Sequence, residues 1–325
     1  MHRSLRHPLV IRGAGVLLAV AIMATVVTTL HEPVMIVPEV GAVSAGLLFF
    51  QIDAWRKGPL PFYLVICGAA FLGVEIARYL PVTLIPQIIV ALASILGAVL
   101  FFRVPAYPAL SAGLLPVYLH IVSPFYVVAV IVFMGLPILA VLTIERPGIG
   151  AGPPVQVSLR TTLVIIISLA IMVVALWLVH SPVAVLPPLF VAAVENANAH
   201  HARSIRQLGV TALVLLGAIE LTIVLVVNLD FIFVILITVL LALFASAKLE
   251  IESPPVLALA IIPIVFDHAI DVRISYLILI GIGLSQIAPP AVTFALDHMF
   301  TLRVRALRSD RQQRETPLDL DRWHG

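Results

Sequence analysis

Long runs of apolar residues, separated by short polar or proline-containing breaks, make up most of the chain. The runs do not alternate with polar residues as the strands of a membrane barrel do, so they predict helices. A bilayer core of about 30 Å requires about 20 apolar residues per helix, and many of the runs approach that length. We predict twelve helical segments, at residues 14–30, 34–51, 62–80, 84–102, 106–122, 124–143, 159–180, 182–197, 208–229, 231–247, 254–268 and 274–295.

Four of the twelve segments are short or interrupted by proline, namely the second, fifth, eighth and eleventh. Such segments either cross the membrane fully or enter it only part of the way. The pattern therefore predicts an all-α polytopic membrane protein with about twelve transmembrane or half-spanning helices.

The composition excludes a soluble protein. Of the 325 residues 62% are hydrophobic and 11% are charged, and the mean hydropathy is +1.15, whereas soluble domains carry roughly 25% charged residues. We expect a protein integral to the inner or plasma membrane, with the lipid bilayer as its main partner. The single cysteine, Cys67, provides neither a disulfide framework nor a cysteine-based metal site.

Basic residues predict the orientation of the chain, because cytoplasmic loops collect lysine and arginine. Arginines concentrate near both ends of the sequence, so both termini are predicted to be cytoplasmic and residues 299–325 to form a basic cytoplasmic tail. No aromatic residues interleave with the arginines of this tail, which argues against nucleic-acid binding. The predicted inward loops contain Arg56, Lys57, Arg103, Arg146, Arg160, Arg203, Arg206 and Lys248.

A Gly- and Pro-rich stretch divides the chain into two membrane parts, residues 1–143 and 159–298, with a cytoplasmic linker at 144–158. Prolines 108 and 116 recur as prolines 255 and 263 at an offset of 147, and Glu75 recurs as Glu220 at an offset of 145. These matches predict two six-segment repeats. Because each repeat has an even number of crossings, the repeats would be parallel, and a substrate site is expected between them near the midplane.

Charged residues inside the apolar runs are candidates for function, because burying a charge in lipid is costly. Glu75 precedes Arg78 by three residues, a spacing that favours an ion pair near the outer surface, with a substrate-linked carboxylate as the alternative. Glu220 has no cation nearby in the sequence and lies half-way along its segment. It is a candidate for proton coupling, with a structural helix contact as the alternative.

The short segments contain the other candidates. Glu39 follows Pro38 in a segment that should bend at that proline, and a helix beginning there would favour an anion, which the Glu39 charge opposes unless the carboxyl is protonated. Ser111 lies in a run of small residues that permits close approach of a helix or a substrate. Ser253 and Pro255 lie at the start of the eleventh segment, which, like the fifth, runs from one proline to a second.

Glu195, His200 and His201 end the eighth segment and are open to a metal-site interpretation, but adjacent histidines point to different faces of a helix, so we predict a polar cap. The sequence contains no Walker, HExxH or nucleophile-elbow motif. We therefore expect no enzyme activity, no cofactor and no metal.

The segment that runs from Ile36 through Pro38, Glu39 and Gly41 to Phe49 resembles the HPP family of membrane proteins, as does the segment from Pro105 to Pro116. The second half is similar more loosely, so the resemblance covers most of the chain as two tandem copies. The His-Pro-Pro sequence of that family is replaced by Ala106-Tyr107-Pro108 and Ser253-Pro254-Pro255. Plant members are linked to nitrite transport, which implies a carrier of a small anion or small molecule.

The function expected from the sequence is a secondary transporter or permease for a small molecule or small anion, with its site between the repeats. Proton coupling and homo-oligomer formation are further options. Two alternatives stay open: a membrane scaffold or partner subunit that transports nothing, and an efflux protein like the aromatic acid exporters. The candidate pathway residues are Glu39, Glu75, Arg78, Ser111, Glu220, Ser253 and Pro255.

Overall fold

The computed structural model describes residues 6–145, 158–181, 184–198, 229–265 and 272–315, together with residues 211, 214, 216 and 217. All regular structure in these ranges is helical, as the sequence predicts. Seven helices have the length and apolar composition needed to cross a membrane, within residues 9–30, 59–79, 84–102, 124–144, 159–179, 231–249 and 278–299.

The helices follow one another in the order α1 (Arg6–Leu30), α2 (Glu39–Ser44), α3 (Asp53–Arg56), α4 (Pro59–Tyr79), α5 (Leu84–Phe102), α6 (Pro108–Leu119), α7 (Pro124–Glu145), α8 (Leu159–Val179), α9 (Pro187–Asn198), α11 (Phe231–Leu249), α12 (Pro255–Val265) and α13 (Val272–Glu315). A 3₁₀ turn, η1 (Pro33–Met35), precedes α2, and a π-helical turn, η2 (Ala45–Phe49), continues it.

Proline and left-handed residues set the limits of many helices. Proline is the first residue of α4, α6, α7, α9 and α12, a position where its missing N–H removes no helical hydrogen bond. Arg103 and Glu250 end α5 and α11 in the left-handed conformation, with φ of 54° and 56°, which closes the last helical turn and stops the helix.

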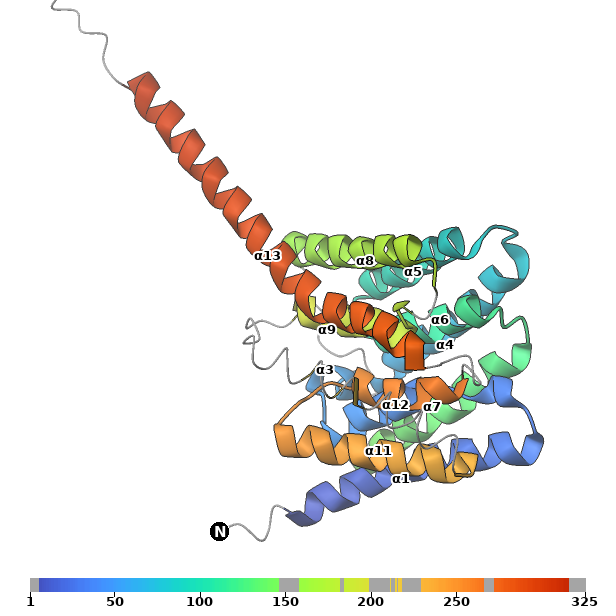
Figure 1. The fold of residues 1–325 in the computed structure, drawn as a ribbon. Coiled ribbons are helices and arrows are strands. Elements are labelled where there is room, and N and C mark those ends of the chain that lie inside the picture. The colour runs from blue at the N-terminus through green and yellow to red at the C-terminus, as the bar shows by residue number, and fades with distance from the viewer. Residues whose placement is uncertain are drawn as a thin grey trace, which may run out of the picture.

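Short helices lie at the centre and long helices surround them. Figure 1 shows α6, α9 and α12 between an upper layer that contains α5 and α8 and a lower layer that contains α1 and α11. The 12 residues of α6 span about 18 Å at 1.5 Å per residue, which is less than the core of a bilayer. The short helices therefore begin or end inside the molecule.

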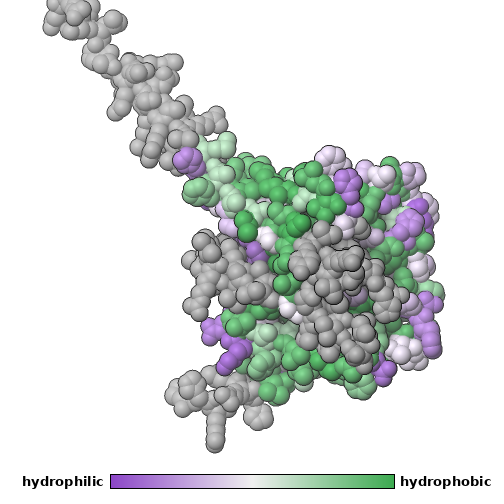
Figure 2. Space-filling view, in the orientation of Figure 1, coloured by the Kyte–Doolittle hydropathy of each residue, from purple (hydrophilic) through white to green (hydrophobic). Residues whose placement is uncertain are grey.

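The outer surface is suited to lipid. Large apolar side chains such as Phe101, Trp177 and Phe294 are well exposed on the long helices. Figure 2 shows hydrophobic residues above and below the grey central part of the bundle and hydrophilic residues mainly along its left and right edges. This distribution, and the seven long apolar helices, are those of an α-helical integral membrane protein.

The helix α13 is longer than the sequence predicts. The prediction ends at residue 295, but α13 continues to Glu315 through Pro289 and Pro290, and Figure 1 shows it projecting from the bundle on the same side as the start of α1. The first residues of the predicted basic tail are therefore part of a helix. The predicted segment 208–229 and most of the linker 144–158 lie outside the described residues.

Candidate functional site

Four short helices, one from each of the four short predicted segments, meet around a small cavity at the centre of the bundle. α2 packs against α12 and α6 packs against α9, and α9 also contacts α12. Each of the four helices turns one face toward the cavity, through residues three or four positions apart. The lining residues are Glu39, Ala42, Pro108, Ser111, Pro188, Val191, Glu195, Pro254, Pro255 and Ala258.

The cavity has a volume of about 10 Å³, which is close to the smallest volume that admits one water molecule. Most of its lining is proline, alanine and valine, and the polar residues among the lining are two glutamates and one serine. Among the described residues no lysine, arginine or histidine lines it. No side-chain cation among the described residues therefore neutralises a negative charge in this cavity.

Glu39 is the central polar residue of the site. It is 1% exposed and belongs to the first turn of α2. The Ser111 hydroxyl on α6 donates a hydrogen bond to Glu39 Oε1, whereas Glu39 Oε2 is buried and has no hydrogen-bond partner. Buried polar atoms are normally paired, so an unpaired oxygen beside a cavity indicates a place for a water, a proton or a ligand.

Glycines permit the helix crossings that hold Ser111 and Glu39 in place. A methyl group on Gly73 of α4 would lie 2.0 Å from the backbone oxygen of Gly113 on α6, and a methyl group on Gly41 of α2 would lie 3.2 Å from the Leu257 oxygen on α12. The predicted close approach at the small residues 111–113 is therefore a helix contact on the Gly113 face. The Ser111 face turns toward the cavity.

Hydroxyl groups of two buried tyrosines are already engaged near the site. Tyr126 donates to the carbonyl of Ala112 at 2.8 Å, and Tyr118 donates to the carbonyl of Val185 at 2.8 Å. Both bonds use backbone oxygens and leave the Glu39 carboxyl without a tyrosine partner. They fix the position of α6 relative to α7 and to the segment before α9.

The structure separates the predicted site residues into two groups. Glu39, Ser111 and Pro255 line one cavity, and Ser253 is buried at 2% exposure two residues before Pro255. Glu75 and Arg78 do not line this cavity. Their side chains form an ion pair of 3.7 Å near the end of α4, and Arg78 also donates to the carbonyl of Val122. Glu220 lies outside the described residues.

Glu195 is a cavity residue that sequence reasoning assigned to a polar cap. It follows Pro188 by seven residues and Val191 by four, so the three share one face of α9 and line the cavity together. The spacing of Glu195 from the Pro187-Pro188 pair is the feature of the sequence that could have indicated its place on the cavity. No cluster of metal-binding side chains occurs among the described residues, and His200 and His201 lie outside them.

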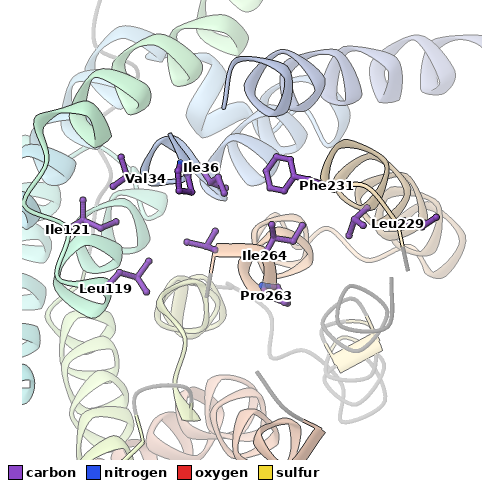
Figure 3. A pocket seen from close by; sticks show the side chains of 11 residues that line it. Val34, Ile36, Leu119, Ile121, Leu229, Phe231, Pro263 and Ile264 are labelled. Atoms are coloured by element: carbon purple, nitrogen blue, oxygen red, sulfur yellow. The ribbon is translucent and has the colours of Figure 1, made fainter. Parts of the chain in front are cut away.

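A second, larger pocket is lined by apolar side chains and by backbone groups. It has a volume of about 600 Å³ and lies where α6 and α12 end and α11 begins. Figure 3 shows apolar side chains such as Leu119, Phe231 and Ile264 around it. None of its described lining residues has a charged or polar side chain that could orient a polar substrate. The small central cavity is therefore the candidate site.

The fold and the cavity define the class of this protein: an α-helical membrane protein with a buried carboxyl among short helices. No family model, no curated protein and no solved structure matches the chain. The resemblance to the HPP family therefore stays a prediction, although Pro108, Pro254 and Pro255, which stand in the place of its His-Pro-Pro sequence, line the cavity.

Proposed function

We propose that this chain is a secondary transporter or permease for a small solute, in the class of small anions or small neutral molecules, with proton coupling. The observation that carries the proposal is the unpaired Glu39 oxygen on a cavity to which both halves of the chain contribute. A buried carboxyl within the membrane is costly, which favours a role in solute or proton movement.

Matching elements support two repeats. The helices α5 (Leu84–Phe102) and α11 (Phe231–Leu249) both have 19 residues, and both of their ends differ by an offset of 147. His31 and His180, at an offset of 149, follow α1 and α8 with φ of 56° and 54°. In each histidine Nδ1 lies near the backbone oxygen two residues earlier, at 3.2 and 3.0 Å.

The cavity lies between the proposed repeats. α2 of the first half packs on α12 of the second, and α9 of the second half packs on α6 of the first. The lining positions match as well: Glu39 and Ala42 correspond to Pro188 and Val191 at an offset of 149, and Pro108 and Ser111 correspond to Pro255 and Ala258 at an offset of 147. Transporters built from repeats bind their substrates at such an interface.

Helix dipoles favour an anion among the possible solutes. α6, α9 and α12 begin at the cavity, through Pro108, Pro188 and Pro255, and the N-terminal end of a helix carries a partial positive charge. The first amides of α6 and α12 already donate to carbonyls that precede each helix. The attraction would therefore act mainly through the dipoles, and protonation of Glu39 would remove the competing negative charge.

The cavity is too small for most solutes, so transport requires the halves to move. Rocking of one half against the other would open the short-helix interface first to one side and then to the other. The cavity volume of about 10 Å³ leaves no room for a solute and corresponds to a closed state in this scheme. Glu220 remains a second candidate for proton coupling on the grounds given by the sequence.

Cysteine accessibility tests the proposal. Single cysteines replace Ala42 and Ala258, which line the cavity, in a Cys67→Ala background. Ala91→Cys is the matched control, because Ala91 is fully buried but does not line the cavity. A membrane-impermeant thiol reagent should label the two cavity positions and not the control.

The same protein in liposomes is then tested for uptake of a panel of inorganic anions and monocarboxylates, with and without a pH gradient. Uptake that depends on the gradient and is lost in Glu39→Gln supports proton-coupled transport. Protection of both cavity positions from each side, together with no uptake of any solute, would instead favour the scaffold.

A further inference from the structure

Two glutamates line the central cavity, one from each half of the chain. Glu39 lies on α2 at 1% exposure with Oε2 unpaired, and Glu195 lies on α9, half-buried, on the same lining. Glu39 is thus enclosed, whereas Glu195 is closer to the polar end of its helix. A cavity large enough for one water molecule lies between these elements.

Polar side chains lead from Glu195 toward the end of α9. Asn196 follows directly and donates to the Ser285 carbonyl of α13 at 2.9 Å and to Gln286 Oε1 at 3.2 Å. Ser285 and Gln286 are both buried, at 0% and 2% exposure. This end of α9 therefore places polar groups inside an otherwise apolar bundle.

The groups that face the two carboxyls bring little positive charge. Ser111 donates to Glu39, and the hydroxyl of the buried Tyr126 donates to the Ala112 carbonyl rather than to Glu39. The helix N-termini of α6, α9 and α12 provide the positive potential in this part of the structure, and such a site disfavours two ionised carboxyls at once.

We propose that Glu39 and Glu195 form a proton-binding pair, in which Glu195 collects a proton from the polar end of α9 and passes it through one water molecule to Glu39 Oε2. In each step an O–H bond breaks on the donor as one forms on the acceptor. The proton leaves Glu195 for the water, and the water releases a proton to Glu39, so the pair holds one proton and one negative charge before and after this transfer.

The inference rests on the proposed proton coupling for its biological role, but its test requires no substrate. The purified full-length protein is placed in lipid membranes, and infrared spectroscopy follows the C=O band of protonated carboxyl groups after transfer to D₂O. Glu39→Gln identifies the band of Glu39. In the wild type the pair should contribute a protonated carboxyl whose deuterium exchange is fast.

Glu195→Gln should slow that exchange by roughly 100-fold, the lower end of what a positioned proton-transfer group contributes. Glu195→Asp retains a carboxyl and should restore part of the rate, which a purely structural role would not do. Glu75→Gln is the control, because Glu75 belongs to the ion pair at the end of α4 and does not line the cavity. It should leave the exchange unchanged.

Labelling with a hydrophobic carbodiimide provides a second measurement on the unmodified chain, in case a variant does not fold. Peptide mass mapping should find the adduct on Glu39 or Glu195, in amounts that fall as the pH rises, and not on Glu75. The absence of a protonated Glu39 at every pH, or wild-type exchange in Glu195→Gln, would overturn the proton pair.

The two proposals fail in different ways. Fast exchange through Glu195 in a protein that transports no solute would retain the pair and refute the transporter. Gradient-driven uptake that is insensitive to Glu195→Gln would retain the transporter and refute this route to Glu39.

Discussion

The contact between Gly73 on α4 and Gly113 on α6 provides a sharp test of how the site is held. A Cβ atom on Gly73 would lie 2.0 Å from the Gly113 backbone oxygen and 2.8 Å from its carbonyl carbon. An ordinary contact begins near 3.4 Å, and the obstacle is backbone, which cannot rotate away as a side chain can. Gly73→Ala must therefore force the two helices apart.

The expected cost follows from two opposing effects. Overpacking of a close contact costs about 1–3 kcal/mol, and alanine recovers about 1 kcal/mol because it favours the helix more than glycine does. Since the clash with backbone is severe, we expect the overpacking cost at its upper end and a net loss of about 2 kcal/mol. Gly68→Ala on the same helix meets nothing within 4 Å and should be neutral or slightly stabilising.

Unfolding in mixed detergent micelles, followed by the loss of helical circular dichroism, gives the free energies of both variants. Because α6 also holds Ser111 against Glu39, Gly73→Ala should in addition change the infrared band of Glu39, and Gly68→Ala should not. Equal stability of the two variants would refute the backbone contact and, with it, the placement of α6 beside α4.

Three further comparisons use matched pairs. Ser111→Ala removes the hydrogen bond to a buried carboxyl and should cost about 1–2 kcal/mol, whereas Ser44→Ala removes a buried hydroxyl without a partner and should be close to neutral by the same unfolding assay. Trp55→Ala empties the space beside Gly46 and Phe62 and should cost about 3–5 kcal/mol, while Trp177→Ala, on a residue 58% exposed, should cost far less. Arg78→Ala should cost no more than about 1 kcal/mol and leave solute uptake intact, because the ion pair with Glu75 is partly exposed and does not line the cavity. Loss of uptake in this variant would show that the pair belongs to the solute pathway.

Much of the helical pattern could be predicted because apolar runs and prolines act locally. Segment 84–102 coincides with α5, and the predicted starts near Pro108, Pro124 and Pro255 agree with the first residues of α6, α7 and α12. Each of these limits depends on a proline at the first helical position or on a left-handed residue at the end. The extension of α13 could not be predicted, because polar residues that follow a membrane helix are compatible with either a helix or a coil.

The site was predicted in part. The cost of burying a charge indicated Glu39, and the run of small residues indicated Ser111, but nothing local in the sequence brings residues on α2 and α6 together. Their meeting depends on the tertiary contacts that place each helix, of Gly41 on α2 with Leu257 on α12 and of Gly113 on α6 with Gly73 on α4. Glu195 was interpreted as part of a polar cap because it precedes Asn196 and two histidines. Its place on the cavity follows from the direction of α9, which the sequence does not specify.

The proposed repeats also explain why the two halves of the chain contribute different polar residues to the cavity. At the positions that correspond to Glu39 and Ser111 the second half has Pro188 and Ala258, so the carboxyl and its hydroxyl donor both come from the first half. A symmetric copy would place another glutamate on a cavity of about 10 Å³, where two negative charges repel and one carboxyl must stay protonated. Replacing that copy with proline and placing the second carboxyl two helical turns further along α9, at Glu195, separates the charges. Glu195 can then supply a proton to Glu39. Its own charge does not oppose the ionisation of Glu39 as a glutamate at position 188 would.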